Sequence, residues 1–306
     1  MYKYLATLVV ITSALFSVKG YAQFTALTEF GDNPGELSAS YLPASDSNDN
    51  LLVLLHGCVQ QGQALAQQSG LLSLAKNKGF ALLIPQQSST NNIKGCFNWF
   101  STQDIEKNQG ESLSIKNMIT TLNAQQNFKN IYIIGLSAGG AMASSMLVHY
   151  PELFSAGAII AGIPYPCADN LITAIACMRS GPSQEPTQLT ALVKTMQPAV
   201  KQWPRLSIWT GLQDKVVNPK NAQHLALHWA QLTQASTLPT VTQHAGYKVS
   251  QWQDQNHAIT VELIEVLDMD HGIAIAPALG DGSSAAPFVI NSAISTSLHL
   301  LNHWQL

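Results

Sequence analysis

The chain has 306 residues, which is long enough for one large domain with a sizeable core, or at most for two domains. Only 11% of its residues are charged, against about 25% in an average soluble protein, and the formal net charge is −3. A base-poor, mildly acidic chain of this kind argues against nucleic acids and anionic membrane surfaces as partners.

The first residues have the pattern of an export signal. Lys3 gives a positive start, residues 5–18 form an apolar run, and residues 20–22 offer small side chains where a signal peptidase reads them. The run is too short and too weakly flanked for a membrane anchor. We therefore expect residues 1–22 to be a cleaved signal peptide, residues 23–306 to form a single catalytic domain, and the mature protein to be periplasmic or extracellular.

The rest of the chain alternates between strand-like and helix-like segments. Apolar alternation at 24–30 and 37–42 predicts an antiparallel hairpin. Buried strands are expected at 51–55, 80–84 (ended by Pro85), 131–134, 154–161 and 206–210, and helices at 63–77, 110–126, 141–150 and 218–232. Paired strands at 247–252 and 258–267 and a helix at 292–304 close the series, whereas segment 162–200 interrupts it as an expected insertion or lid.

This alternation predicts an α/β fold, in which helices cover both faces of a mainly parallel central sheet. In such sheets the ligand-binding and catalytic groups lie at the carboxyl ends of the strands. The loops that follow strands are therefore the places to look for chemistry.

Residues 131–140 read I-Y-I-I-G-L-S-A-G-G and contain the pattern G-x-S-x-G around Ser137. A strand leads into the pattern and a helix leaves it, which is the context of a nucleophile elbow in an α/β-hydrolase fold. Gly135 and Gly139 avoid the crowding that side chains would cause at such a tight, strained turn. Ser137 is the predicted nucleophile, and the amide of Ala138 is a predicted donor to an oxyanion.

A serine nucleophile needs a base and an orienting carboxylate, in the chain order Ser, Asp or Glu, His. Asp214 directly follows the strand at 206–210, so it is the predicted carboxylate. Asp254, Asp268 and Asp270 lie on later loops or strands and are the alternatives.

Eight histidines follow Ser137 in the sequence. Five fall in segments expected to be helical: His149, His224, His228, His299 and His303. His244 precedes a strand and His257 opens one. His271 lies on the loop after the strand at 258–267, where this fold places its base, and Gly272 gives that loop freedom to turn. His271 is therefore the predicted base.

A second oxyanion donor is expected from the loop after the strand at 51–55, because the fold draws one donor from such a loop. His56, Gly57 and Cys58 occupy this loop. The backbone N–H of Cys58 is the predicted donor.

The four cysteines lack the spacing of a zinc site, and in an exported protein they predict two disulfides. Three connectivities are possible, and the sequence does not choose among them. Cys167 with Cys177 would be a short local clip. Cys58 with Cys96 would hold the oxyanion amide still, which is a reason to prefer this pairing.

Eight motifs follow one another along the chain: L-L-H-G-C-x-Q at 54–60, C-F-N-W-F at 96–100, G-E-S-L-S-I at 110–115, G-L-S-A-G-G-A-M at 135–142, Y-P-E-L-F-S-A-G-A at 150–158, A-G-I-P-Y at 161–165, D-K-V-V-N-P-K-N at 214–221 and N-H-W-Q-L at 302–306. With them the chain resembles the polyhydroxybutyrate depolymerase-type esterases, a family that includes feruloyl and acetylxylan esterases. The resemblance implies the same Ser, Asp and His as the triad.

The resemblance also implies substrate-pocket residues. His56 corresponds to a histidine beside the oxyanion loop and Trp99 to an aromatic residue near the acyl site, and Asn98 beside it is included as a third candidate. Two positions depart from the family pattern: residues 270–273 read D-H-G-I in place of a G-H-A-W-like segment, and Thr210 replaces a histidine. These departures bear on the pocket rather than on the triad.

The sequence therefore predicts a secreted serine esterase that works through an acyl-enzyme, with no metal and no organic cofactor, and the resemblance implies 3-hydroxybutyrate polymer or oligomers as its substrate. A feruloyl or acetylxylan esterase is the alternative within the family, and an inactive hydrolase fold that serves as a binding protein is a distant one. Polymer-degrading members of the family typically carry a linker and a separate binding domain. Because no linker to a second module is expected in this sequence, soluble esters or short oligomers are the expected substrates.

Overall fold

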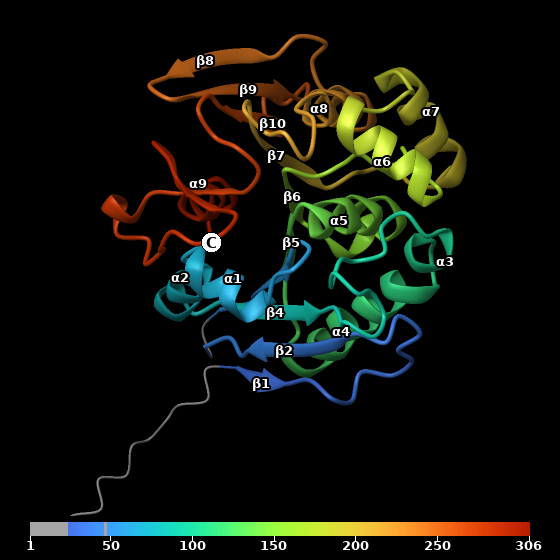
Figure 1. Ribbon diagram of the computed structural model, residues 1–306, viewed down its shortest axis with the longest axis vertical. Helices are drawn as coiled ribbons and strands as arrows, with labels where there is room; N and C mark the ends of the chain where they lie inside the picture. The colour runs from blue at the N-terminus through green and yellow to red at the C-terminus, as the bar shows by residue number, and fades with distance from the viewer. Residues whose placement is uncertain (1–23, 46–47) are drawn as a thin grey trace, which may run out of the picture.

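The computed structural model describes residues 24–45 and 48–306, so the predicted signal peptide lies outside the described residues. A ten-stranded sheet crosses the molecule in the order β1-β2-β4-β3-β5-β6-β7-β10-β9-β8 (Figure 1). Its strands are β1 Thr25–Ala26, β2 Ser38–Leu42, β3 Asn50–Leu55, β4 Ala81–Gln86, β5 Asn130–Leu136, β6 Ala156–Ile160, β7 Arg205–Gly211, β8 Thr240–His244, β9 Tyr247–Gln253 and β10 Ile259–Val266. In this sheet order, neighbouring strands from β4 through β3, β5, β6 and β7 to β10 pair in parallel, and antiparallel strands flank them at both edges.

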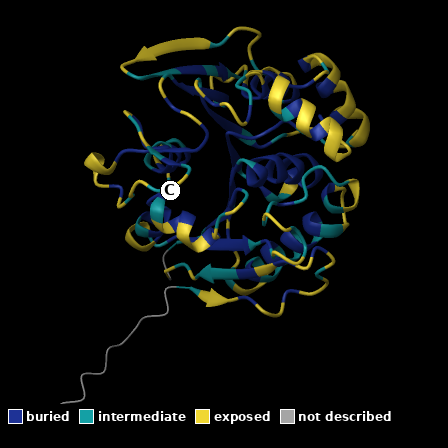
Figure 2. Ribbon diagram, viewed as in Figure 1, coloured by how far each residue is buried: buried dark blue, intermediate teal, exposed yellow. Residues whose placement is uncertain are grey.

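The central strands are buried on both faces because helices cover both sides of the sheet. In β3, Leu51, Val53 and Leu55 point into one core, whereas Leu52 and Leu54 point into the other. The first core is covered by α4 Gly110–Gln126, α5 Ala138–His149 and α8 Lys220–Leu232, and the second by α1 Gly62–Gln68, α2 Leu71–Lys78 and α9 Thr296–Trp304. The prediction of a mainly parallel sheet between two helical layers is confirmed (Figures 1 and 2).

The remaining elements lie outside these layers. They are the helices α3 Thr102–Ile105, α6 Leu171–Ser180 and α7 Pro186–Met196, the 3-10 turns η1 Pro151–Leu153 and η2 Pro277–Leu279, and a small parallel pair, β11 Ile273–Ile275 and β12 Val289–Asn291. The predicted antiparallel pairing near the N-terminus joins β1 to β2. The predicted insertion at 162–200 holds α6 and α7.

Two of the predicted elements differ from the structure for a clear physical reason. The helix predicted at 63–77 is two helices, because Gly70 has a φ of +81° and a Cβ there would collide with the carbonyl of Asp281. The strand predicted to end before Pro85 continues to Gln86. β3 pairs with β4 only as far as Leu83, and at Pro85 the partner is Ala39 of β2 alone, so the proline lies where the ladder is one-sided.

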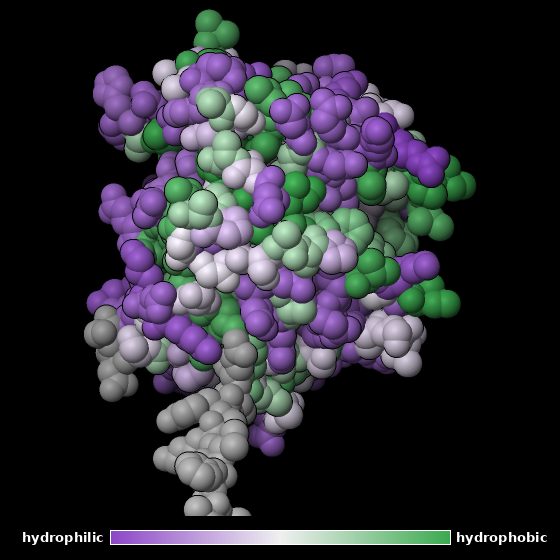
Figure 3. Space-filling view, turned by 60° about the vertical axis from the view of Figure 1, so that its left-hand side comes forward, coloured by the Kyte–Doolittle hydropathy of each residue, from purple (hydrophilic) through white to green (hydrophobic). Residues whose placement is uncertain are grey.

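β8 is not predicted from the sequence, and it places His244 on a strand rather than in a loop. All five residues of β8 are exposed, as the edge of the sheet at the top of Figure 2 shows, so no burial pattern marks the strand. Within the described ranges, no helix is both long enough and apolar enough to cross a bilayer. The face drawn in Figure 3 is largely hydrophilic, with hydrophobic side chains interspersed.

Candidate active site

Ser137 occupies the single residue between β5 and α5. Its backbone has φ 55° and ψ −117°, a conformation that L-residues rarely adopt, and α5 starts at Ala138, three residues earlier than predicted. A Cβ on Gly135 would collide with the carbonyl of Gly139, and a Cβ on Gly139 would collide with the carbonyl of Leu55. Only glycines at both positions allow the strand and helix to approach closely enough for this turn.

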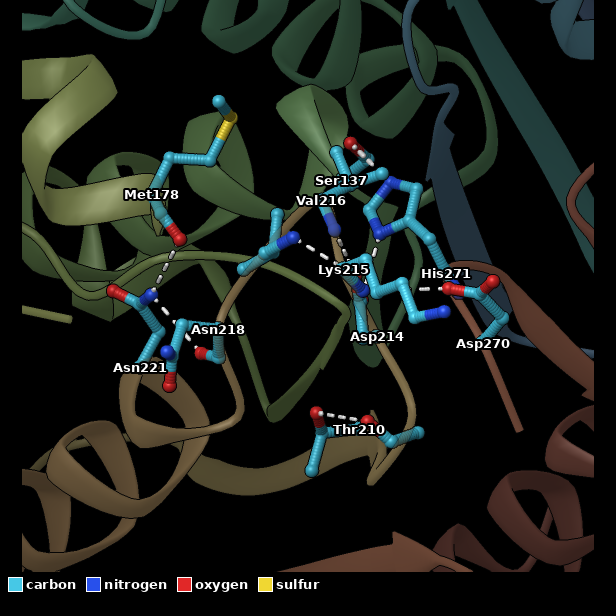
Figure 4. Close-up of polar contacts among 12 residues, drawn as sticks. Ser137, Met178, Thr210, Asp214, Lys215, Val216, Asn218, Asn221, Asp270 and His271 are labelled. Atoms are coloured by element: carbon cyan, nitrogen blue, oxygen red, sulfur yellow. Dashed lines mark hydrogen bonds and ion pairs between the residues drawn. The ribbon is translucent and has the colours of Figure 1, made fainter. Parts of the chain in front are cut away.

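The structure brings Ser137 together with the predicted base and carboxylate (Figure 4). The Nε2 atom of His271 lies 2.9 Å from the Oγ of Ser137, and its Nδ1 lies 2.7 Å from Oδ2 of Asp214. The other carboxylate oxygen, Oδ1, accepts the amides of Val216 and Val217 at 2.8 Å each. The Asp214 side chain is completely buried and that of His271 is 8% exposed. In this geometry the neutral imidazole donates from Nδ1 and can accept the serine proton at Nε2.

The loops that carry these two side chains pack directly on each other. A Cβ on Gly211 would collide with the carbonyl of Met269, and Oδ1 of Asp270 accepts the amides of His271 at 2.8 Å and Lys215 at 3.3 Å. These amides hold the pKa of Asp270 below its usual value. Asp270 thus joins the two loops and does not contact the imidazole as Asp214 does. Gly272 has no left-handed φ; glycine is required there because a Cβ would collide with the carbonyl of Phe288.

In the loop after β3, the amide of Cys58 is free to meet an oxyanion. The amide of Gly57 donates to Oε1 of Gln60 at 2.8 Å, and that of Val59 donates to the carbonyl of Lys94 at 2.7 Å. The Cys58 amide between them has no acceptor within the described part of the chain. The Ala138 amide is at the first turn of α5, where helical amides lack an intrahelical partner. Cys58 and Ala138 both line the cavity beside Ser137.

Both cysteine pairs are joined as the sequence analysis preferred. Cys58 is bonded to Cys96, which ties the loop after β3 to the loop before α3. Cys167 is bonded to Cys177 within the insertion. The C-terminal end of α6 is further held by the amide of Asn218, which donates to the carbonyl of Met178 at 2.8 Å. The side-chain amide of Asn221 donates to the same carbonyl at 3.3 Å (Figure 4).

A cavity of about 230 Å³ opens at Ser137. Its walls are mostly apolar, and they are formed by Gly57, Cys58, Val59, Gln60, Trp99, Leu136, Ser137, Ala138, Ile163, Met178, Val216, Val217, His271 and Phe288. Trp99 lies on the wall, as predicted. The predictions of His56 and Asn98 as pocket residues are corrected, because neither lines the cavity.

His56 instead points away from the cavity, at the start of the loop after β3. It is completely buried, with Nδ1 donating to the carbonyl of Gly57 at 2.8 Å and Nε2 accepting the amide of Gln87 at 3.1 Å. Burial lowers the pKa of His56, which keeps the ring neutral. The Oδ1 of Asn98 accepts from Nδ2 of Asn92 at 2.8 Å. Both side chains therefore support loops.

Several wall residues were not among the predicted site residues. Val216 and Val217 were within reach, since they belong to the D-K-V-V motif that follows Asp214. Met178 comes from the insertion and Phe288 from the segment before β12. No local pattern marks these last two, because only the packing of distant segments brings them to the pocket.

A family model described as "Esterase PHB depolymerase" matches residues 37–248, which is more than half of the chain. The chain belongs to this esterase family. The esterase is 32% identical over 300 residues to poly(3-hydroxyalkanoate) depolymerase C of Paucimonas lemoignei, covering 95% of this chain and 72% of the relative. It is 29% identical to feruloyl esterase B of Thermothelomyces thermophilus, covering 68% of this chain and 75% of the relative.

Among solved structures, the acetyl xylan esterase from Aspergillus awamori matches the esterase with a TM-score of 0.73 at 22% sequence identity. The match covers 81% of this chain and 93% of the other. With the sheet described above, this similarity shows the predicted α/β-hydrolase fold. The family and its relatives together make the protein a carboxylic-ester hydrolase.

Proposed function

We propose that this esterase hydrolyses its substrate through an acyl-enzyme, with Ser137 as nucleophile, His271 as general base and acid, and Asp214 as orienting carboxylate. One observation carries the proposal. A continuous hydrogen-bonded chain runs from Asp214 through His271 to Ser137 and ends at an apolar cavity. The strained backbone of Ser137 supports it, because such strain is typical of nucleophile elbows.

In the first half-reaction, Oγ of Ser137 attacks the ester carbonyl carbon while Nε2 of His271 takes its proton. Buried Asp214 stabilises the imidazolium that forms. The amides of Cys58 and Ala138 donate to the oxyanion of the tetrahedral intermediate. The intermediate collapses as His271 gives its proton to the leaving alcohol. Water then repeats the sequence on the acyl-enzyme and releases the acid, and Ser137 regains its proton.

The walls of the cavity support an acyl group that is apolar and small. Val59, Val216, Met178 and Phe288 offer hydrocarbon surface and no hydrogen-bonding side chain. A short aliphatic hydroxyacyl unit suits these walls, because burial of its methyl and methylene groups is favourable. A polysaccharide chain would need polar partners for its hydroxyl groups.

The surface of α6 extends this apolar wall away from the pocket. Leu171 and Ile175 lie on the same flank as Met178, because residues at i, i+4 and i+7 share one face of a helix. They are 55% and 41% exposed. At a rise of 1.5 Å per residue, the three side chains form an apolar stripe about 10 Å long, which leads outward from the acyl site. The stripe supports an aliphatic oligoester, such as a 3-hydroxybutyrate oligomer, as the substrate.

A fluorophosphonate probe tests the serine mechanism directly. We expect the wild type to be labelled and Ser137→Ala not to be. Equal labelling of the two proteins would reject the serine nucleophile. Hydrolysis of a short p-nitrophenyl ester that disappears in His271→Ala would in turn exclude an inactive binding protein.

Substrate preference is tested with 3-hydroxybutyrate oligomers of increasing length beside feruloyl and acetyl sugars. We expect kcat/KM to rise with oligomer length in the wild type and to stay flat in the double variant Leu171→Ser/Ile175→Ser. Leu238→Ser, which changes an exposed leucine in the loop before β8, is the matched control. A preference for feruloyl or acetyl sugars would favour the second candidate function, which the names of two relatives support. We also propose export, since paired cysteines suit an oxidising compartment.

A further inference from the structure

Glu111 is a buried carboxylate that takes no part in the steps above. It is the second residue of α4 and is completely inaccessible to solvent. All of its polar partners are neutral N–H donors: Nε2 of Gln87, Nδ2 of Asn91 at 3.3 Å and the backbone amide of Asn98 at 2.8 Å. An acceptor-only group, which is what an ionised carboxylate is, satisfies this set of donors.

Two routes lead from Glu111 to the predicted oxyanion amide. Gln87 donates its side-chain amide to the carbonyl of Cys96 at 3.1 Å, and Cys96 is bonded to Cys58. The backbone amide of the same Gln87 donates to Nε2 of His56, which precedes the oxyanion loop. Through Gln87, Glu111 therefore holds both Cys96, which is bonded to Cys58, and His56, which precedes Cys58 in the chain.

A third contact reaches the pocket wall. The backbone amide of Asn98 donates to Glu111, and Asn98 immediately precedes Trp99, which lines the cavity. The backbone of Gly35 closes the other side of Glu111, because a Cβ on Gly35 would press on its backbone. Little space is left for the carboxylate to move without the segment that it holds.

We propose that ionised Glu111 is a positioning residue of the esterase, which holds the 87–99 segment so that the amide of Cys58 meets the oxyanion. This inference rests on the proposed serine mechanism. Protonation would convert one acceptor oxygen into a donor that faces N–H groups, and one of these contacts would be lost. The oxyanion loop would then loosen, and kcat would fall while substrate binding in the apolar pocket changed little.

The ionisation of Glu111 falls in an accessible pH range. Burial raises the pKa of Glu111 to about 8, against the lowering effect of its donors. Asp104 on α3 raises this pKa further through its negative charge. His56, which accepts the amide of Gln87, has a pKa that is lowered by burial, so its ring stays neutral here. Activity that depends on ionised Glu111 therefore rises with pH through about 8.

The test is the dependence of kcat and KM for p-nitrophenyl butyrate on pH, from about pH 5 to about pH 10. We expect a rise in wild-type kcat near pH 8 that Glu111→Gln abolishes. In that variant kcat at high pH should be about tenfold lower, less than the 10²–10³ for complete loss of one oxyanion donor, with KM within about twofold. Asp104→Asn should move the rise to lower pH. Glu262→Gln removes a buried carboxylate of β10 that contacts Ser207 and His299, and should leave the rise in place.

Each outcome decides the inference. A rise near pH 8 that persists in Glu111→Gln overturns it, and so does an Asp104→Asn profile that coincides with the wild type. If Glu111→Gln does not fold, the Asp104→Asn shift decides alone. A wild type that a fluorophosphonate does not label overturns the serine mechanism and this inference with it. If the wild type is labelled but the pH profile of kcat in Asp104→Asn coincides with that of the wild type, this inference is overturned and the serine mechanism stands.

Discussion

Replacing Asp214 by Asn changes one atom of the hydrogen-bonded chain and leaves its shape intact. Asp214 uses Oδ2 for Nδ1 of His271 and Oδ1 for the amides of Val216 and Val217. Asn has one oxygen, which should stay on the two amides, because the opposite orientation would leave both buried donors unpaired at about 1–3 kcal/mol each. The new NH₂ group then donates to Nδ1 of His271. The imidazole must then carry its proton on Nε2, so Nε2 cannot accept the hydroxyl proton of Ser137.

We therefore expect Asp214→Asn to lower kcat by about 10⁴-fold, the size of effect that a wrong histidine tautomer has in serine proteases, or about 5.5 kcal/mol of transition-state stabilisation. Stability should change by less than about 1 kcal/mol, since the turn keeps its hydrogen bonds. Steady-state hydrolysis of p-nitrophenyl butyrate measures the first quantity and chemical denaturation the second.

The matched control is Asp254→Asn. Oδ1 of Asp254 also accepts two backbone amides, those of Asn256 at 2.8 Å and Ala258 at 2.9 Å, but on the turn between β9 and β10 and without a histidine partner. This variant should keep at least about a third of the activity, as surface changes away from a site usually do. A folded Asp214→Asn protein with more than about a tenth of wild-type kcat would refute the tautomer argument.

Three further predictions follow from the same geometry. Cys96→Ser should lower kcat by about tenfold or more with KM within about threefold, because the loop that presents the Cys58 amide loses its covalent tie; unchanged kinetics after quantitative loss of the disulfide would contradict this. Ser137→Gly should abolish hydrolysis yet raise the free energy of unfolding by about 1 kcal/mol, since glycine relieves the strain at φ 55°, and a less stable variant would count against strain. The raised pKa of Glu111 means that the folded state binds its proton more tightly than the unfolded state. The protonated carboxyl of Glu111 therefore contributes fully to the free energy of unfolding below about pH 4.5, and this contribution, up to about 5 kcal/mol, is lost as pH rises through about 8. The free energy of unfolding should depend less steeply on pH in Glu111→Gln.

Local patterns were sufficient where one segment carries the whole signal. The apolar strand before Gly135 and the spacing of Gly135 and Gly139 around Ser137 were enough to predict the elbow, because sterics within ten residues decide that turn. The alternation of strands and helices was enough to predict the layers. Sequence order then ranked Asp214 and His271 among many candidates, and the structure places both within hydrogen-bonding distance of their predicted partners.

Predictions failed where the decisive neighbour is remote in sequence. Gly70 divides a predicted helix through its φ of +81°, and the carbonyl of Asp281, more than two hundred residues away, leaves no room for a side chain there. His56 was predicted as a pocket residue, yet its two ring nitrogens are both engaged within the core, by Gly57 and Gln87. β8 has no buried face, so the strand depends on its hydrogen bonds to β9 alone.

The sequence by itself determined the proposed chemistry: the predicted elbow, the order of the predicted acid and base, and the loop of the predicted oxyanion amide all follow from residue type and spacing. Only the tertiary structure decided what surrounds that chemistry. Met178 and Phe288 come from separate segments to form the cavity wall, and Glu111 reaches the oxyanion loop through Gln87 and a disulfide. The physical reason is that turns follow from local sterics, whereas burial and hydrogen-bond networks depend on which distant segments fold against each other.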